Sequence, residues 1–165
     1  MPRPDLHQHG FYGIGVFHPK NSVNVGTLWR SGLMFGAAFL FTIGPRFKQQ
    51  CSDTMKAWRR VPMLTFDSFE MLVSHLPFSC PLVAVELVEP SIPLPDYRHR
   101  KRACYLLGAE DHGLPASVLE RCVDRVWIPT AYPVGPMSSL NVATAGTLVI
   151  YDRLIKNGWK KGHAT

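Results

Sequence analysis

The sequence predicts an α/β fold with a mainly parallel sheet flanked by helices, and three observations support this prediction. Apolar runs of strand length alternate along the chain with segments whose apolar residues recur at helical spacing. Several of these runs are apolar throughout, which is typical of strands buried on both faces. The 165 residues, 46% of them hydrophobic, fit a single domain with a sizeable core.

The first part of the chain predicts a strand, a helix and a second strand. Residues 13–17 form a short apolar run that ends in His-Pro-Lys-Asn, which indicates a buried strand entering a loop. A helix should follow, with Asn24 or Ser22 as its N-cap and Gly36 at its C-terminus. Its apolar residues at helical spacing are Val25, Leu28, Trp29 and Leu33. The Phe-rich run 37–43 then predicts the next strand.

The middle of the chain is less regular. Residues 46–60 are polar and basic, so we expect an exposed loop and helix there, followed by a short strand over 63–66. Helical spacing recurs over 69–76, and the apolar run 81–87 predicts a strand that ends among carboxylates. The proline-rich segment 90–95 should break the chain.

The last part of the chain predicts two further strands and two helices. A buried strand over 103–107 delivers Gly108, a short helix follows over 114–122, and a brief strand covers 126–128. After a loop over 129–136, a helix should begin at Ser138. Because this helix is apolar on most sides, we expect it to be buried, with a second subunit as one candidate partner.

Composition narrows the function classes. Eighteen Lys and Arg against twelve Asp and Glu give a net charge of +6, which favours a polyanion as the large partner. The four cysteines are scattered without a CxxC pair or a nearby histidine cluster, so we expect reduced thiols and no metal site. Without a run of about 18 apolar residues or a signal pattern, the chain is expected to have no membrane partner and to be cytoplasmic.

Three segments that follow predicted strands carry polar residues, and ligands of open parallel sheets bind at such loops. In the first, Asn24 and Arg30 lie six residues apart, nearly two helical turns. In the second, two glycines flank carboxylates in Gly-Ala-Glu-Asp-His-Gly-Leu-Pro over 108–115. In the third, Ile128-Pro129 is followed by a loop and by Ser-Leu-Asn over 139–141.

Each segment has a structural interpretation as well. Asn24 could be a helix cap beside a solvated Arg, and Glu110 or Asp111 could cap the helix after a tight turn. In the third segment Ser138 or Ser139 could cap the last helix. Capping requires only one polar residue, however, and Asn141 at the start of an apolar, buried helix would need a partner for its amide. That requirement points to a site.

Taken together and in this order, the three segments resemble the three motifs of the SpoU/TrmH branch of the SPOUT superfamily of RNA methyltransferases. The resemblance spans nearly the whole chain, and in size it is closest to the short TrmL-like enzymes that methylate tRNA ribose. It implies a single SPOUT methyltransferase domain over 1–165, a knot and cofactor-binding region over 103–152, a C-terminal deep trefoil knot and an obligate homodimer.

The resemblance also implies the roles of individual residues. The cofactor-binding positions, for S-adenosylmethionine, are Val85, Gly108, Ile128, Ser139 and Leu140. The catalytic positions are Arg30, Asn24, Ser139, Asn141 and Glu110. Either Ser138 or Ser139 takes the serine role. Because a guanidinium stays protonated, we favour a hypothesis in which Arg30 binds the adjacent phosphate and stabilises charge on the 2′-oxygen.

The implied activity is S-adenosylmethionine-dependent methylation of a ribose 2′-hydroxyl in RNA, with tRNA favoured and its wobble nucleotide as the expected target. Methylation of an RNA base or of rRNA ribose by a SPOUT enzyme is the nearest alternative, and a metabolic α/β enzyme is a third. The Asn24 and Arg30 pair favours ribose, because base methylation in this superfamily typically uses a carboxylate. The basic runs 98–102 and 48–60 are candidate RNA contacts or solvated charges.

Overall fold

The computed structural model of this chain describes residues 10–44, 59–108, 111–131 and 139–158. These residues form a seven-stranded sheet in the order β3-β2-β1-β6-β4-β7-β5, and each pairing between neighbours is parallel. The strands are β1 Phe11–Phe17, β2 Phe39–Ile43, β3 Met63–Phe66, β4 Leu82–Val85, β5 Ile92–Pro93, β6 Arg102–Leu107 and β7 Asp124–Trp127. The helices are α2 Ser22–Phe35, α3 Phe69–Ser74, the 3-10 helix η2 Leu94–Asp96, α4 Ala116–Leu119 and α5 Val142–Lys156. The prediction of a parallel α/β sheet is confirmed.

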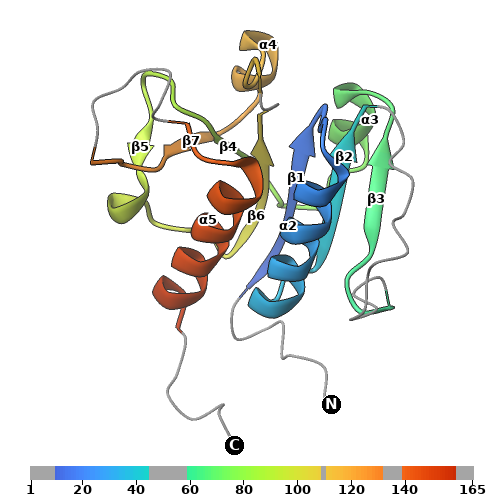
Figure 1. The fold of residues 1–165 in the computed structure, drawn as a ribbon, viewed down its shortest axis with the longest axis horizontal. Helices are drawn as coiled ribbons and strands as arrows, with labels where there is room; N and C mark the ends of the chain where they lie inside the picture. The colour runs from blue at the N-terminus through green and yellow to red at the C-terminus, as the bar shows by residue number, and fades with distance from the viewer. Residues whose placement is uncertain (1–9, 45–58, 109–110, 132–138, 159–165) are drawn as a thin grey trace, which may run out of the picture.

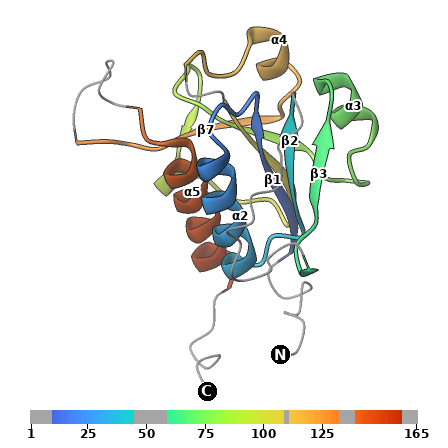
Figure 2. The same ribbon diagram turned by 45° about the vertical axis from the view of Figure 1, so that its right-hand side comes forward.

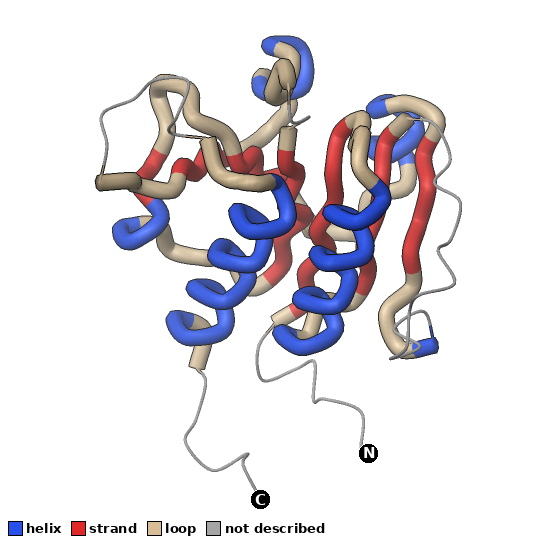
Figure 3. Tube along the Cα trace, in the orientation of Figure 1, coloured by secondary structure: helices blue, strands red, loops and turns tan. Residues whose placement is uncertain are grey.

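Helices cover both faces of the sheet. Helices α2 and α5 run side by side on one face (Figures 1, 2 and 3). A first core lies between them and the sheet, and a second core packs α3 and α4 against the other face. The two neighbouring helices approach closely at Gly146, where a Cβ would lie 2.6 Å from Cδ1 of Leu28. The hydroxyl of Thr147 also donates to that of Ser31 across the same contact, at 2.7 Å.

Helix α2 has a cap that differs from the predicted one. Oδ1 of Asn21 accepts from the backbone N–H of Val23 at 2.8 Å, so neither Asn24 nor Ser22 is the N-cap. The reason is the helix start, which lies earlier than expected and leaves Asn24 inside the first turn. Its side chain instead accepts a hydrogen bond from Asn141. Gly36 ends the helix in the left-handed conformation, with φ of 81°, as predicted.

Helix α5 also starts elsewhere than expected. It begins at Val142 and is capped by Asn141, not by Ser138 or Ser139, of which Ser138 lies outside the described residues. Its inner face is buried as expected, whereas on its outer face Leu148, Tyr151 and Ile155 are 39%, 50% and 45% exposed in the single chain.

Two further elements differ from the sequence prediction. Residues 90–95 were expected to break the chain, yet β5 and η2 form there. Strand β5 pairs with β7 through Ile92 and Pro93, and an edge strand tolerates proline because one side of it needs no N–H donor. Helix α4 covers only 116–119 of the predicted 114–122. Pro115 is its N-cap, and beyond it the N–H groups of Arg121 and Cys122 bond to carbonyls three residues earlier, so the chain leaves the α-helical pattern.

The carboxyl-terminal half of α5 is fixed by a polar cluster, which we call the amino-edge clasp because it lies beside the start of β6. Its members are His99, Tyr105, Asp152, Arg153 and Lys156. The side chain of His99 is fully buried, with Nδ1 2.6 Å from the Tyr105 hydroxyl and Nε2 2.8 Å from Oδ2 of Asp152. Burial lowers the pKa of His99 below its usual 6.5, although Asp152 opposes that shift.

Arg153 is the most deeply buried charged group of the clasp, with 1% of its surface exposed. Its guanidinium donates to the carbonyls of Arg100, at 2.5 Å, and Lys101, at 2.8 Å. Gly10 packs so tightly there that a Cβ would lie 2.8 Å from Nη2 of Arg153. The start of β1 and the end of α5 therefore lie together at this edge.

Candidate functional site

A pocket of about 640 Å³ opens at the carboxyl edge of the sheet, the opposite edge from the clasp. The loops after β1, β4, β6 and β7 and the start of α5 form its walls. All the predicted cofactor positions line it, namely Val85, Gly108, Ile128, Ser139 and Leu140. Its volume lies within the usual range for small-molecule sites in proteins.

The first and third predicted segments meet at this pocket. Nδ2 of Asn141 donates to Oδ1 of Asn24 at 3.0 Å, although the two residues are 117 positions apart. Oδ1 of Asn141 accepts from the backbone N–H groups of Ala143 and Thr144, at 2.9 and 3.2 Å. Asn141 thus caps α5 and holds Asn24 with the same amide. The amide therefore has the partners that were predicted, although Asn141 itself is exposed at the start of the helix.

Two other predicted catalytic residues are not among the described residues that line the pocket. Arg30 lies on the exposed side of α2, about 9 Å along the helix axis from Asn24. Glu110 lies outside the described residues. The pocket of this chain therefore contains Asn24, Ser139 and Asn141 from the predicted catalytic set, without Arg30.

Glu86 is a pocket residue to which sequence reasoning assigned no role. Its Oε2 accepts from the backbone N–H of Leu114 at 2.9 Å, and its Oε1 accepts from that of Leu87 at 3.0 Å. The side chain lies against Gly108 and Gly113. The signal in the sequence was a carboxylate directly after a buried strand, at the edge of a parallel sheet where ligands bind.

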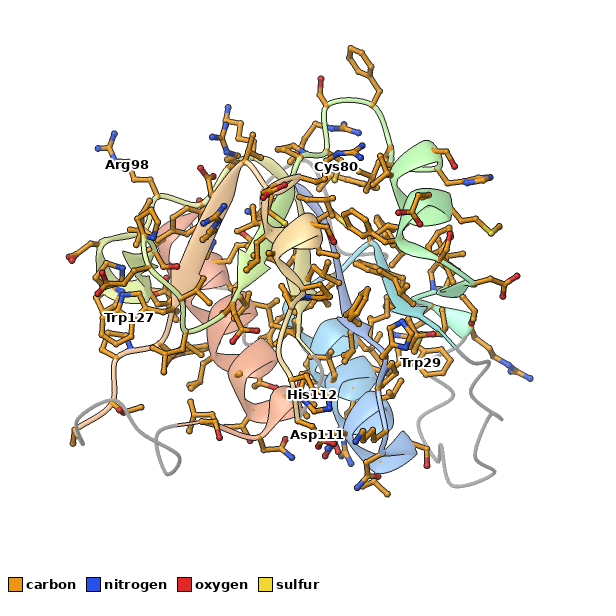
Figure 4. The ribbon with its side chains drawn as sticks, turned by 90° about the horizontal axis from the view of Figure 1, so that it is seen from above. Trp29, Cys80, Arg98, Asp111, His112 and Trp127 are labelled. Atoms are coloured by element: carbon orange, nitrogen blue, oxygen red, sulfur yellow. The ribbon has the colours of Figure 1, made fainter. Side chains whose placement is uncertain are left out.

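Charged groups from two loops meet at the rim of the pocket. Lys20, from the loop after β1, forms an ion pair with Asp111, from the loop after β6. Figure 4, viewed from above, shows Asp111 and His112 beside the first turn of α2 and Trp127 on the far side of α5. Asp111 and Trp127 both line the pocket. The pocket therefore has an ion pair at its rim on one side and Trp127 on the other.

The described part of the chain contains neither a cluster of metal ligands nor a helix that could span a membrane. No group of three or more His, Cys, Asp or Glu among these residues is placed to hold a metal ion. None of the described helices is long and apolar enough to cross a membrane.

Comparison with known proteins connects this geometry to a family. The family model described as SpoU rRNA Methylase matches residues 13–151. The tRNA (guanosine(18)-2'-O)-methyltransferase TARBP1 of Mus musculus is 28% identical over 137 residues, which cover 78% of this chain. This chain spans only 8% of the length of that curated relative.

Solved structures share the fold. The structure reported as "Structural insights into the 2-OH methylation of C/U34 on tRNA" is 25% identical, with a TM-score of 0.74, and the match covers 90% of this chain and 97% of that one. The SpoU methyltransferase AviRb from Streptomyces viridochromogenes, in complex with the cofactor AdoMet, is 23% identical with a TM-score of 0.72. That match covers 94% of this chain and 66% of AviRb.

Proposed function

The chain belongs to the SpoU rRNA Methylase family of RNA methyltransferases, and from this premise we propose that it methylates a ribose 2′-hydroxyl of tRNA with S-adenosylmethionine as donor. The observation that carries the proposal is the meeting of three distant sequence segments, through Asn24, Gly108 and Asn141, at one pocket. The names of TARBP1 and of the C/U34 structure both describe 2′-O methylation of tRNA, which favours this substrate and, for the second, the wobble nucleotide.

The donor is proposed to bind in the pocket at the carboxyl edge. AviRb, which shares this fold, was solved with AdoMet. S-adenosylmethionine supplies an electrophilic methyl group when it is bound. Backbone groups near Gly108, Ile128 and Leu140 would hold it, with Val85 and Ser139 beside them, and we expect residues 103–152 to form the trefoil knot that shapes these loops.

A homodimer is proposed because α2 and α5 leave an apolar surface uncovered in the single chain. The exposed apolar side chains of these helices are Val23, Met34, Leu148, Tyr151 and Ile155. Arg30 lies one turn from Met34, and residues four apart share a helix face, so it lies within the same surface. A second copy packed there would cover the apolar residues and bring Arg30 to the pocket of the partner.

Arg30 would then act on the RNA in the partner's site. Methyl transfer to a hydroxyl is an in-line displacement, so alignment of donor and acceptor supplies much of the rate enhancement. The guanidinium would bind the phosphate next to the target ribose and stabilise negative charge as it develops on the 2′-oxygen. The proton leaves through phosphate or water.

The test of this function is transfer of labelled methyl groups from S-adenosylmethionine to RNA by the purified protein. Bulk tRNA and rRNA are offered separately, and the product is digested to nucleosides. We expect label in tRNA, on a ribose that resists alkaline cleavage of the adjacent phosphodiester bond. Label on a base or in rRNA alone would contradict the proposed substrate, and no transfer to any RNA would contradict the activity.

Arg30→Lys tests the role of the guanidinium. We expect turnover to fall by about 100-fold while donor affinity stays unchanged, because an ammonium cannot bind phosphate through two parallel hydrogen bonds. Arg121→Lys, at an exposed arginine outside the two basic runs, is the matched control and should keep its turnover. Full turnover by the Arg30→Lys enzyme would show that two parallel hydrogen bonds from a guanidinium are not required.

A further inference from the structure

Glu86 joins two loops of the pocket through one carboxylate. It follows β4 directly, and its Oε1 accepts from the N–H of Leu87 at 3.0 Å. Its Oε2 reaches across to the loop after β6 and accepts from the N–H of Leu114 at 2.9 Å. The side chain is half-buried and lines the pocket. A charged acceptor with a backbone donor on each oxygen makes stronger hydrogen bonds than a neutral one.

The loop after β6 is folded over this carboxylate at two glycines. A Cβ on Gly108 would lie 2.5 Å from Oε2 of Glu86, and so would a Cβ on Gly113. Gly113 also has φ of +63°, in the region that side chains rarely adopt. The contact therefore requires glycine at both positions, and the carboxylate occupies the space that two side chains would otherwise fill.

We infer that Glu86 is a positioning residue that holds Gly108, Gly113 and Leu114, on the loop after β6, in the conformation that binds the methyl donor. This inference rests on the proposed function, since Gly108 is one of the proposed donor contacts. Without the carboxylate, the N–H of Leu114 would lose its partner and the two glycines would face an empty space. The loop would then sample other conformations, and donor binding would carry the cost of ordering it.

The chemistry of the carboxylate provides a graded test. Glutamate only accepts hydrogen bonds, whereas glutamine has one accepting oxygen and one donating NH₂ group. In Glu86→Gln the NH₂ group must face the N–H of either Leu87 or Leu114, so one of the two bonds is lost. Glu86→Ala loses both. A residue that only fills space would give nearly the same result with glutamine as with glutamate.

Calorimetric titration with S-adenosylmethionine and with S-adenosylhomocysteine measures the effect in the full-length protein. We expect Glu86→Gln to weaken both ligands by about tenfold and Glu86→Ala by more. Because the residue acts through the loop, the ratio of the two affinities should stay constant. Glu89→Gln, an exposed carboxylate in the same connection, is the control and should bind as the wild type does.

Gly113→Ala perturbs the same contact while leaving Glu86 in place. The added Cβ would push the carboxylate away from Leu114, so donor affinity should fall as it does in Glu86→Gln. Gly36→Ala is the matched control, because Gly36 has a similar φ of +81° but no atom within 4 Å of its Cβ position. Thermal unfolding of each variant checks that the fold survives.

The outcomes separate this inference from the proposed function. Unchanged donor affinity in folded Glu86→Ala and Gly113→Ala proteins would overturn the positioning role. It would also be overturned if the Glu86 variants bound S-adenosylmethionine more weakly but S-adenosylhomocysteine as well as the wild type does. That result would indicate direct attraction between the carboxylate and the sulfonium charge. If the wild-type protein binds neither ligand, the proposed donor is wrong, and the role of Glu86 falls with it.

Discussion

The two ends of helix α5 are built from polar residues in opposite ways. At its start, Asn141 is exposed and makes hydrogen bonds to α5 and to Asn24 beside an open pocket. At its end, Arg153 and the side chain of His99 are buried, and charged groups fill the amino-edge clasp. Buried polar groups must be satisfied by the protein itself, whereas exposed ones remain available to a ligand. The comparison indicates that the clasp contributes stability and the pocket end contributes binding.

Removing the guanidinium of the clasp should have the largest effect on stability. In Arg153→Met the carbonyls of Arg100 and Lys101 lose their buried donor, so we expect the free energy of unfolding to fall by about 3 kcal/mol. Urea denaturation measures the change, and Lys101→Met, at an exposed position, is the control. A loss of less than about 1 kcal/mol would show that the clasp does not fix the helix.

Changes at the pocket end should cost less stability. Asn141→Ala removes the N-cap of α5 and should lower the free energy of unfolding by about 1 kcal/mol. Asn141→Asp keeps an accepting oxygen for the cap but loses the donor to Asn24, so stability should be retained while methyl transfer falls. If the Asp variant transferred methyl groups as fast as the wild type, the contact with Asn24 would not contribute to the site.

The smallest effect should be a pH dependence that comes from the clasp. Because burial lowers the pKa of His99 in the folded protein, the unfolded chain takes up a proton first as the pH falls below 6.5. The contribution of neutral His99 is therefore complete above that pH and is lost as the pH drops towards the folded-state pKa. Melting temperatures from about pH 8 to about pH 5 measure it, and His99→Gln should flatten the slope. An unchanged slope would assign the dependence to other groups.

Asp124, which lies near the clasp, should give the stability a second dependence on pH, in a more acidic range. The hydrogen bonds from Arg100 lower the pKa of its carboxyl below the usual 3.8, so its stabilising effect is lost only as the solution becomes more acidic than that. The separation between 6.5 and 3.8 allows the two contributions to be measured in one titration.

The parallel sheet was predictable because most of its strands are short apolar runs, which can be recognised from local composition alone. The meeting of Asn24, Gly108 and Asn141 at one pocket was also predictable, since parallel strands place the loops that follow them at one edge. The N-cap of α2 was not, because Asn21, Ser22 and Asn24 are similar capping residues and only the packing of α2 selects among them.

Features that depend on residues far apart in the chain could not be predicted from sequence patterns. Strand β5 forms because Ile92 pairs with Val126 of β7. The prolines around Ile92 argue against a strand when the local sequence is considered alone. In the clasp, His99 and Asp152 are 53 residues apart, and neither belongs to a motif. The bond between Glu86 and Leu114 likewise spans 28 residues and involves a backbone donor that any residue supplies.

The contact between Gly10 and Arg153 has a consequence for chain topology. The start of β1 and the end of α5 lie together on the edge away from the pocket, so a short peptide linker from Asn157 to Gly10 would make the backbone circular without crossing the pocket. A linear chain can untie a knot when it unfolds, but a ring keeps its crossings permanently. Refolding rates of the ring and the linear chain would therefore isolate the time spent threading the proposed knot.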